Sequence, residues 1–508
     1  MVCYKNPVLP GFYPDPSVCR KGEDYYLVNS SFEFFPGIPI FHSKNLVEWE
    51  QIGHVLTRKS QLDLADCPAS GGIWAPTIRL NKNRFYVSAT NYRKGGNFYV
   101  WTDDIYQDWS EPLWVEQGGI DPSLFFDEDG TTYFTSTYDY PDGQAIGQCV
   151  IDIKSGKKLT ETKVIWGGSG GKYTEGPHMF RRGKWYYLLA AEGGTEYGHM
   201  VTTARSTSPW GPFENCPRNP ILTHRDTMLH HFQAIGHADF VDTPEGITWA
   251  VFHGIRTSQY MLHHMGRETM LAPVLWDEEE WPVINNRHII TEQMEVEKLP
   301  AQISINIREK KSSISFPEAA DGWNYLRNPE YTCYLPGKTE NSIVLKGSKK
   351  RLDECKSPTF IGMRQQDFCF FARVKVEFEV FSSKSNVGMS IYHTNEHHYD
   401  LMITQRNERI AVVLRKRVGD MLTESAPVYM DNAEKLVLQI QADRLHYVFY
   451  CGLGDERMEK IGSGRTQLLS TECMPMTFTG CFIGLFAEEE AKGEFSDFCY
   501  IPQNELTK

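Results

Sequence analysis

Residues 15–30 read DPSVCRKGEDYYLVNS, two short apolar runs joined by a polar turn. The second run is rich in aromatic and β-branched residues, and this order of run, turn and run is typical of a β-hairpin. Proline on both sides of Asp15 fixes φ at positions 14 and 16 and biases residues 13 and 15 away from the helical region. Taken alone, the stretch is a stiff turn that opens a strand, and Asp is a common turn residue.

Four similar hairpins follow along the chain. Their first residues lie roughly 46 to 61 positions apart, which leaves room for about four short strands in each unit. Four strands with a period near 50 are typical of a β-propeller blade, so five units predict a five-bladed β-propeller over residues 1–295. The later hairpins are APTIRLNKNRFYVSAT from Ala75, DPSLFFDEDGTTYFTST from Asp121, GPHMFRRGKWYYLLAA from Gly176 and HADFVDTPEGITWAVFHG from His237.

One strand of each propeller blade lines the central channel, so the residues that open equivalent strands are expected to point toward one shared place. Three carboxylates, a tryptophan and a histidine occupy these positions, and such a set is hard to explain as packing. The five residues, at or just before the start of each strand, are Asp15, Trp74, Asp121, Glu175 and His237.

The pattern changes after the fifth hairpin. The stretch EQMEVEKLPAQISINIREKKSS is polar and charged, and it predicts a linker over residues 296–315. Beyond it, stretches such as FCFFARVKVEFEVF and ERIAVVLRKRV alternate apolar and polar residues with a period of two. This alternation, with almost no helical period, predicts an antiparallel β-sandwich of the concanavalin-like or jelly-roll kind over residues 316–508. The whole chain is therefore expected to be all-β.

The bulk composition narrows the classes of partner. The chain of 508 residues has a net charge of −13 and no basic block, so nucleic acid is excluded, whereas an uncharged substrate is compatible. No stretch of about 18 apolar residues could span a membrane, and the N-terminus lacks an apolar core of signal-peptide length. The twelve cysteines are scattered and are expected to be reduced thiols, which favours the cytoplasm. A homo-oligomer stays open.

Three of the channel residues suit the hydrolysis of a glycoside. That reaction requires two carboxyl groups beside the sugar's anomeric carbon, an acid for the leaving oxygen and, in an inverting enzyme, a base for water. A third carboxylate can raise the pKa of the acid by like-charge repulsion. Asp15, Asp121 and Glu175 supply these groups from three blades, and the shorter Asp suits the base while the longer Glu suits the acid.

Several motifs also resemble a known family. YPDPS, GIDPSLFFDEDG and TEGPHMF stand in the order and at the intervals of glycoside hydrolase family 43. SGGIWAPTIR, AAEGGTEYGH, IGHADFV and GRETMLAPV look like further pieces of its β-xylosidase and α-L-arabinofuranosidase branch. That branch also has a C-terminal β-sandwich, so the resemblance covers the whole chain.

The resemblance implies roles for individual residues. Asp15 matches the general base, Glu175 the general acid, and Asp121 the aspartate that tunes the pKa of the acid and orients it. On residue type alone the aromatic residues could be channel packing and the arginine could merely pair with a carboxylate. The substrate-binding positions of the family are matched by Phe32, Trp74, Thr195, His237 and Arg267.

The resemblance implies no required cofactor. In some relatives the histidine that matches His237 supports a bound cation or an ordered water, so a structural Ca²⁺ in the propeller channel is left open. A satisfied structural histidine is the competing interpretation.

The expected activity is that of an inverting, exo-acting hydrolase that releases terminal β-D-xylose from xylo-oligosaccharides. An α-L-arabinofuranosidase, or an enzyme with both activities, is the alternative, because STYDYPDGQAIGQC lacks the tryptophan often present in this loop of xylosidases. A non-catalytic carbohydrate-binding propeller would lack a carboxylate, and a fructan-acting enzyme would need an NDPNG-type opening. The C-terminal sandwich is expected to be structural, with a sugar-binding module as the alternative, and the resemblance suggests that one of its loops completes the pocket rim.

Overall fold

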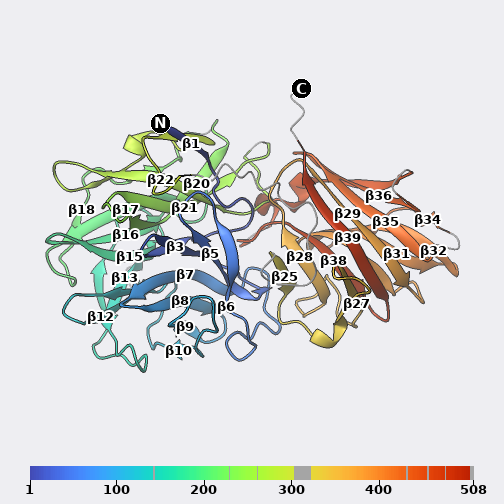
Figure 1. The fold of residues 1–508 in the computed structure, drawn as a ribbon, viewed down its shortest axis with the longest axis horizontal. Coiled ribbons are helices and arrows are strands. Elements are labelled where there is room, and N and C mark those ends of the chain that lie inside the picture. The colour runs from blue at the N-terminus through green and yellow to red at the C-terminus, as the bar shows by residue number, and fades with distance from the viewer. Residues whose placement is uncertain are drawn as a thin grey trace.

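The computed structural model describes residues 1–140, 143–227, 229–259, 261–302, 322–430, 433–454, 457–474 and 476–503. Figure 1 shows two bodies side by side, a propeller formed by the N-terminal part of the chain and a sandwich formed by the C-terminal part. The expected all-β class and its two architectures are confirmed. The described residues contain no α-helix; besides strands they form 3-10 turns at Asn285–Arg287, Tyr331–Cys333, Thr466–Leu469 and Thr471–Cys473.

Each predicted hairpin opens one antiparallel sheet of the propeller. The first strands of neighbouring sheets contact one another, which makes them the innermost strands around the channel. From the inside outward, blade 1 has β2 (Ser17–Lys21), β3 (Asp24–Val28), β5 (Gly37–Ser43) and β6 (Glu50–Leu56), and blade 2 has β7 (Gly72–Asn81), β8 (Arg84–Tyr92), β9 (Gly96–Thr102) and β10 (Leu113–Trp114). Blade 3 has β11 (Ser123–Phe126), β12 (Thr132–Tyr140), β13 (Gly143–Val150) and β14 (Lys163–Trp166), and blade 4 has β15 (Glu175–Arg182), β16 (Trp185–Glu192), β17 (Met200–Ser206) and β18 (Glu214–Asn215), with β19 (Leu222–Thr223) also paired to β17. Blade 5 has β20 (Phe232–Asp242), β21 (Thr248–Arg256), β22 (Glu268–Trp276) and β23 (Pro282–Ile284).

The two ends of the propeller segment are tied together. Strand β1 (Val2–Lys5) pairs antiparallel with β24 (Gln293–Val296), so Val296 still belongs to a strand at the start of the expected linker. Residues 303–315 of that linker lie outside the described residues. The division into residues 1–295, 296–315 and 316–508 therefore stays a prediction.

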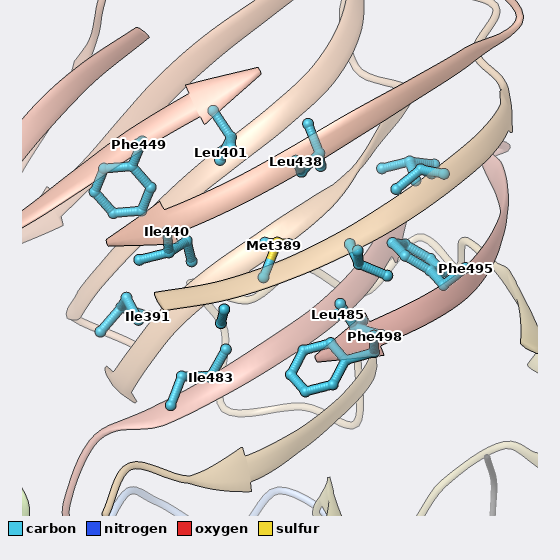
Figure 2. Packing of buried hydrophobic residues seen from close by; sticks show 14 of the residues in the cluster. Met389, Ile391, Leu401, Leu438, Ile440, Phe449, Ile483, Leu485, Phe495 and Phe498 are labelled. Carbon is cyan, nitrogen blue, oxygen red and sulfur yellow. The ribbon is translucent and has the colours of Figure 1, made fainter. Parts of the chain in front are cut away.

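The C-terminal part forms two packed antiparallel sheets. In β29 (Phe370–Glu379) buried and half-buried residues alternate along most of the strand, as a period of two requires. Figure 2 shows apolar side chains of both sheets meeting between them, among them Met389, Leu401, Leu438 and Phe495. One sheet has β25 (Trp323–Leu326), β28 (Thr359–Arg364), β30 (Asn386–Thr394), β31 (His397–Arg406), β32 (Arg409–Val418), β33 (Met421–Glu424), β34 (Val428–Tyr429) and β38 (Phe482–Glu488); the other has β26 (Tyr334–Pro336), β27 (Ser342–Lys346), β29, β35 (Lys435–Ala442), β36 (His446–Gly452), β37 (Glu459–Arg465) and β39 (Lys492–Pro502).

The propeller and the sandwich share a sheet. Strand β4 (Phe34–Phe35), from the loop between β3 and β5, pairs with β25 of the sandwich. The ring of Phe34 stacks on Phe482 with centroids 3.9 Å apart. Buried Arg364 of the sandwich donates from Nε to the Phe12 carbonyl at 2.7 Å, three residues before Asp15. The sandwich thus supports the propeller segments that lead to the channel.

The sequence predicted that no stretch spans a membrane and that the cysteines are reduced thiols. Within the described residues, no helix is long and apolar enough to cross a membrane. The buried cysteines Cys19, Cys67 and Cys149 are unbridged.

Candidate active site

The innermost strands open with a repeated backbone turn. At the equivalent position of all five blades, φ lies between 35° and 59°, in the left-handed region. Glycine adopts this conformation freely and Asp tolerates it better than most residues, which explains the Asp and Gly of the repeat. The five residues are Asp15, Ala75, Asp121, Gly176 and His237.

A bulge accompanies this turn in blades 2, 4 and 5. The pairing register shifts between Trp74 and Thr77, between Glu175 and His178, and on both sides of Gly236 in β20. A bulge changes the direction of the side chains beside it. In blades 2 and 4 the residue before the turn lines the pocket, in blade 2 together with the turn residue Ala75. In the other three blades the turn residue itself lines it.

The channel ends in a pocket of about 400 Å³ at this face of the propeller. Every residue that the sequence predicted for the site lines it: Asp15, Phe32, Trp74, Asp121, Glu175, Thr195, His237 and Arg267. Further lining residues include Tyr92, Asp139, Gln144, Tyr173, Glu196, Met476 and Phe478. The last two belong to the sandwich.

Asp15 is buried and held from several sides. Ser30 Oγ donates to its Oδ2 at 2.6 Å, and Arg267 Nη1 donates to its Oδ1 at 2.5 Å. Its backbone N–H donates to Nδ1 of His253 at 3.0 Å. Burial alone would raise the pKa of Asp15, but the guanidinium of Arg267, together with the neighbouring His253 and His237, holds the pKa well below the usual range. Asp15 is therefore ionised and fixed in orientation.

Glu175 has the opposite protonation tendency. Burial raises the pKa of this carboxyl well above its usual value, and the nearby charges of Asp121 and Asp15 raise it further. Burial and the charge of Asp15 also raise the pKa of Asp121, to about 7, although the backbone N–H of Gly176 donates to Asp121 Oδ2 at 3.0 Å. At neutral pH the proton therefore resides on Glu175.

His237 in the pocket wall and the buried His253 behind Asp15 are neutral. The Nδ1 of His237 lies 3.8 Å from Asp15 Oδ1, and Gly176 leaves room for the ring, because a Cβ there would lie 2.9 Å from its Cε1. Burial lowers the pKa of His237, and it lowers that of His253 to about 3. Neither imidazole competes with Glu175 as a proton donor at neutral pH.

Aromatic rings from both domains form one wall of the pocket. The Trp74 ring stacks on Tyr92 with centroids 4.0 Å apart, and it lies 6.0 Å from the Phe32 ring. The Phe478 ring of the sandwich completes this wall, 5.5 Å from Trp74. Gly480 lets its loop approach the propeller closely, because a Cβ there would lie 2.3 Å from the Met265 carbonyl. A loop of the sandwich does complete the pocket.

The loop before Glu175 is held by one buried carboxylate. Glu192 accepts hydrogen bonds from the backbone N–H groups of Ser169 and Gly171, at 2.7 and 2.6 Å, and from Thr202 Oγ1. The Gly-rich stretch before Glu175 is thereby held in place. Thr195 lies in the loop that directly follows Glu192.

Below the pocket the channel is filled by an ion pair. Arg79 Nη1 and Nη2 donate to Asp239 at 2.7 and 3.1 Å, and Ser17 Oγ donates to the same carboxylate. Ca²⁺ takes about six to eight oxygen ligands. Near His237 the carboxylates of Asp15 and Asp239 are already paired with guanidinium groups, so these residues do not fit a Ca²⁺ site. Across the described residues, no three His, Cys, Asp or Glu side chains are grouped to hold a metal ion.

Some residues that shape the site carry no signal in the sequence. Phe478 stands outside the repeated hairpins and reaches the pocket only through the tertiary fold. Ser30 and His253 belong to the first and fifth hairpins, but nothing in those hairpins marks them as partners of Asp15. Tyr92 ends β8 of blade 2, a strand buried along its whole interior, and nothing in this pattern indicates its stacking on Trp74. Together, the ionised carboxylate of Asp15 and the protonated carboxyl group of Glu175 line a pocket that has an aromatic wall. This arrangement suits acid–base hydrolysis of a sugar.

Comparison with known proteins agrees with this geometry. The family model "Glycosyl hydrolases family 43" matches residues 4–282, and "Beta xylosidase C-terminal Concanavalin A-like domain" matches residues 315–501. The chain is 38% identical over 493 residues to a non-reducing end alpha-L-arabinofuranosidase of Bacteroides ovatus, covering 95% of this chain and 91% of that protein. It is 33% identical over 532 residues to a xylosidase/arabinosidase of Butyrivibrio fibrisolvens, covering both chains fully. A solved structure, Bacteroides ovatus Xyloglucan PUL GH43B, superposes with a TM-score of 0.91 at 35% identity over 99% of this chain and 100% of the other.

Proposed function

The chain belongs to family 43 of the glycosyl hydrolases and is a glycosidase, and from this premise we propose that it is an inverting, exo-acting enzyme that releases terminal β-D-xylose from xylo-oligosaccharides. One observation carries the proposal. Three buried carboxyl groups from three blades share one pocket, with Asp15 held ionised and Glu175 held protonated.

In the proposed reaction the terminal sugar lies in the pocket against Phe32 and Trp74. Asp15 takes a proton from a water molecule, whose oxygen attacks the anomeric carbon. Glu175 gives its proton to the glycosidic oxygen as the bond to the leaving sugar breaks, so one water is consumed and one bond is cleaved. The configuration at the anomeric carbon is inverted.

The other polar residues prepare these two steps. Asp121 raises the pKa of Glu175 through its charge and orients the loop of the acid through the Gly176 N–H. Arg267 keeps Asp15 ionised and presents its remaining donors to the sugar. Acid–base hydrolysis of this kind requires no cofactor.

An α-L-arabinofuranosidase is the second candidate. The similarity to the Bacteroides ovatus protein of that name supports it. The stretch STYDYPDGQAIGQC, which spans the β12–β13 hairpin, has Tyr138 and Tyr140 but no tryptophan, whereas xylosidases of this branch often have a longer, tryptophan-bearing loop there. D-Xylopyranose and L-arabinofuranose can present the anomeric carbon and hydroxyls alike, so one set of carboxyl groups serves both sugars.

We also propose a cytoplasmic enzyme that acts on small oligosaccharides. The buried, unbridged thiols of Cys19, Cys67 and Cys149 support a reducing compartment. A pocket, in contrast to an open groove, favours attack at chain ends.

Two measurements test the proposal. The purified protein is assayed side by side on aryl β-D-xylopyranoside and aryl α-L-arabinofuranoside, and the faster substrate identifies the sugar. Xylohexaose is then followed in time, and exo action predicts xylose and xylopentaose as the first products, without early xylobiose, xylotriose or xylotetraose. Absence of turnover on both aryl glycosides by a folded protein would contradict the proposal.

A further inference from the structure

We propose that Ser70 and Glu33 are positioning residues that join the propeller and sandwich halves of the aromatic wall, and thereby set the affinity of the pocket for its terminal sugar. The inference rests on the proposed function only in taking a sugar as the occupant of the pocket. Ser70 lies at the end of the connection between β6 and β7, and Glu33 lies beside β4.

Ser70 holds one wall residue from each domain. Its carbonyl accepts a hydrogen bond from Trp74 Nε1 at 2.9 Å. Its hydroxyl oxygen accepts a hydrogen bond from the Phe478 backbone N–H at 2.9 Å. Both bonded residues line the pocket, whereas Ser70 itself is buried behind them. One residue therefore fixes the indole and the sandwich loop relative to each other.

Glu33 holds Ser70 in turn. The Ser70 N–H donates to Glu33 Oε2 at 2.9 Å, and Ser70 has a left-handed backbone with φ of 58°. The Glu33 side chain is fully buried, and its Oε1 has no hydrogen-bond partner among the described residues. A buried carboxyl group with one unsatisfied oxygen lowers the stability of the folded state. Its presence behind the aromatic wall therefore suggests a role in function, which is to hold Ser70.

The rest of this connection has its own supports. Asn328 of the sandwich accepts from the Leu64 N–H and donates to the Leu62 carbonyl, at 2.6 and 2.9 Å. Arg327 Nε donates to the Cys67 carbonyl. Removing the Ser70 hydroxyl therefore leaves the path of the chain in place and frees only the Phe478 loop.

The wall contacts the sugar before and during the reaction alike. A looser wall weakens binding of substrate and transition state together, which raises KM and leaves kcat nearly unchanged. If Ser70 and Glu33 served folding alone, their substitution would lower the stability of the protein without raising KM selectively over kcat.

The first test is Ser70→Ala, assayed on the faster aryl pentoside. We expect KM to rise by about 3- to 10-fold, the usual effect of one lost hydrogen bond, with kcat within about twofold. Ser60→Ala is the matched control, because Ser60 lies in the same connection and its hydroxyl donates to Glu111 at the surface. An unchanged KM in Ser70→Ala, or an equal change in Ser60→Ala, would overturn the proposal.

A double-mutant cycle tests the route of the effect. In a Phe478→Ala background, Ser70→Ala is expected to add less than about twofold to KM, because the ring it positions is gone. Full additivity of the two changes would show that Ser70 does not act through Phe478.

Glu33 is tested by a pair of substitutions. Glu33→Gln keeps an amide oxygen that accepts the Ser70 N–H, so KM should stay within about twofold of the native value. Glu33→Leu removes that acceptor, and KM should rise at least as much as in Ser70→Ala. Equal KM values for the two variants would contradict the role given to Glu33.

A measurement independent of turnover separates this inference from the proposed function. Amide hydrogen exchange of the peptide that contains Phe478 should be faster in Ser70→Ala than in the native protein, and unchanged in Ser60→Ala. Native protein that cleaves neither aryl pentoside would refute the proposed function while this exchange still tests the tether. Unchanged exchange in Ser70→Ala would refute the tether.

Discussion

Replacing Arg267 by Met should move the pH dependence of the enzyme to higher pH. The guanidinium donates to Asp15 Oδ1 at 2.5 Å, and both side chains are about 7% exposed. An opposite charge this close lowers the pKa of a carboxyl group by about 1 to 3 units. Without it, only the Ser30 hydrogen bond and the neighbouring histidines oppose the effect of burial on Asp15, and the acid limb of kcat/KM should rise by about 1 to 3 pH units.

The alkaline limb should move in the same direction. Arg267 also lowers the pKa values of Asp121 and Glu175, so its removal favours the protonated form of the acid still further. At the new optimum, kcat/KM should fall about 10- to 100-fold, because a charged hydrogen-bond donor to the sugar is lost.

The assay is kcat/KM for the faster aryl pentoside between about pH 3 and 10, at constant ionic strength. Arg84→Met is the matched control, because Arg84 pairs with Asp103 at the surface of blade 2 and its loss changes the net charge equally. A pH profile of Arg267→Met that overlays the native profile would refute the role of Arg267 in keeping Asp15 ionised. So would the same shift in Arg84→Met.

Three further outcomes follow from the site. Asp15→Asn should lower kcat by about 10²- to 10⁴-fold with KM within a few-fold, since the base is lost and the wall is kept; native-like kcat would contradict its assignment. Glu175→Gln should lose similar activity on xylobiose but much less on a dinitrophenyl glycoside, whose leaving group needs no proton, and equal losses on both would count against Glu175 as the acid. Burial raises the pKa of Glu33 from 4.5 to about 7, so the folded state binds this proton more tightly and native stability falls as pH rises from 4.5 through 7. In thermal unfolding, Glu33→Gln should therefore be more stable than the native protein by about 3 kcal/mol at pH 8, and this difference should vanish near pH 4. A difference in stability that does not change with pH would mean that Glu33 does not titrate in this range.

The repeat made the centre of the site predictable. Asp15, Asp121 and His237 occupy the same position of the first, third and fifth hairpins, and a propeller brings such positions to one channel. Trp74 and Glu175 stand one residue earlier, at bulges of β7 and β15, and they also line the pocket, whereas the bulged strand β20 presents the turn residue His237. The spacing of the repeated hairpins thus indicates which residues meet in the channel, but not the direction in which each side chain points.

The supports of the site were not predictable from the sequence. Ser70 and Phe478 are 408 positions apart, and no local pattern relates them. Glu33 stands in an apolar stretch, and its role becomes apparent only from the hydrogen bond that its carboxyl group accepts from the Ser70 N–H. Contacts of this kind arise where the sandwich docks on the propeller, and periodicity within either domain carries no information about them.

The central claim is that Asp15 and Glu175 act as base and acid on opposite sides of the anomeric carbon, so that one displacement by water inverts it. Proton NMR of the first-formed sugar, recorded during cleavage of an aryl β-D-xylopyranoside before mutarotation, tests this directly. The claim predicts α-D-xylose as the initial product, followed by slow appearance of the β-anomer. Initial formation of β-D-xylose would contradict it, because retention requires a covalent sugar–enzyme intermediate that this assignment of Asp15 excludes.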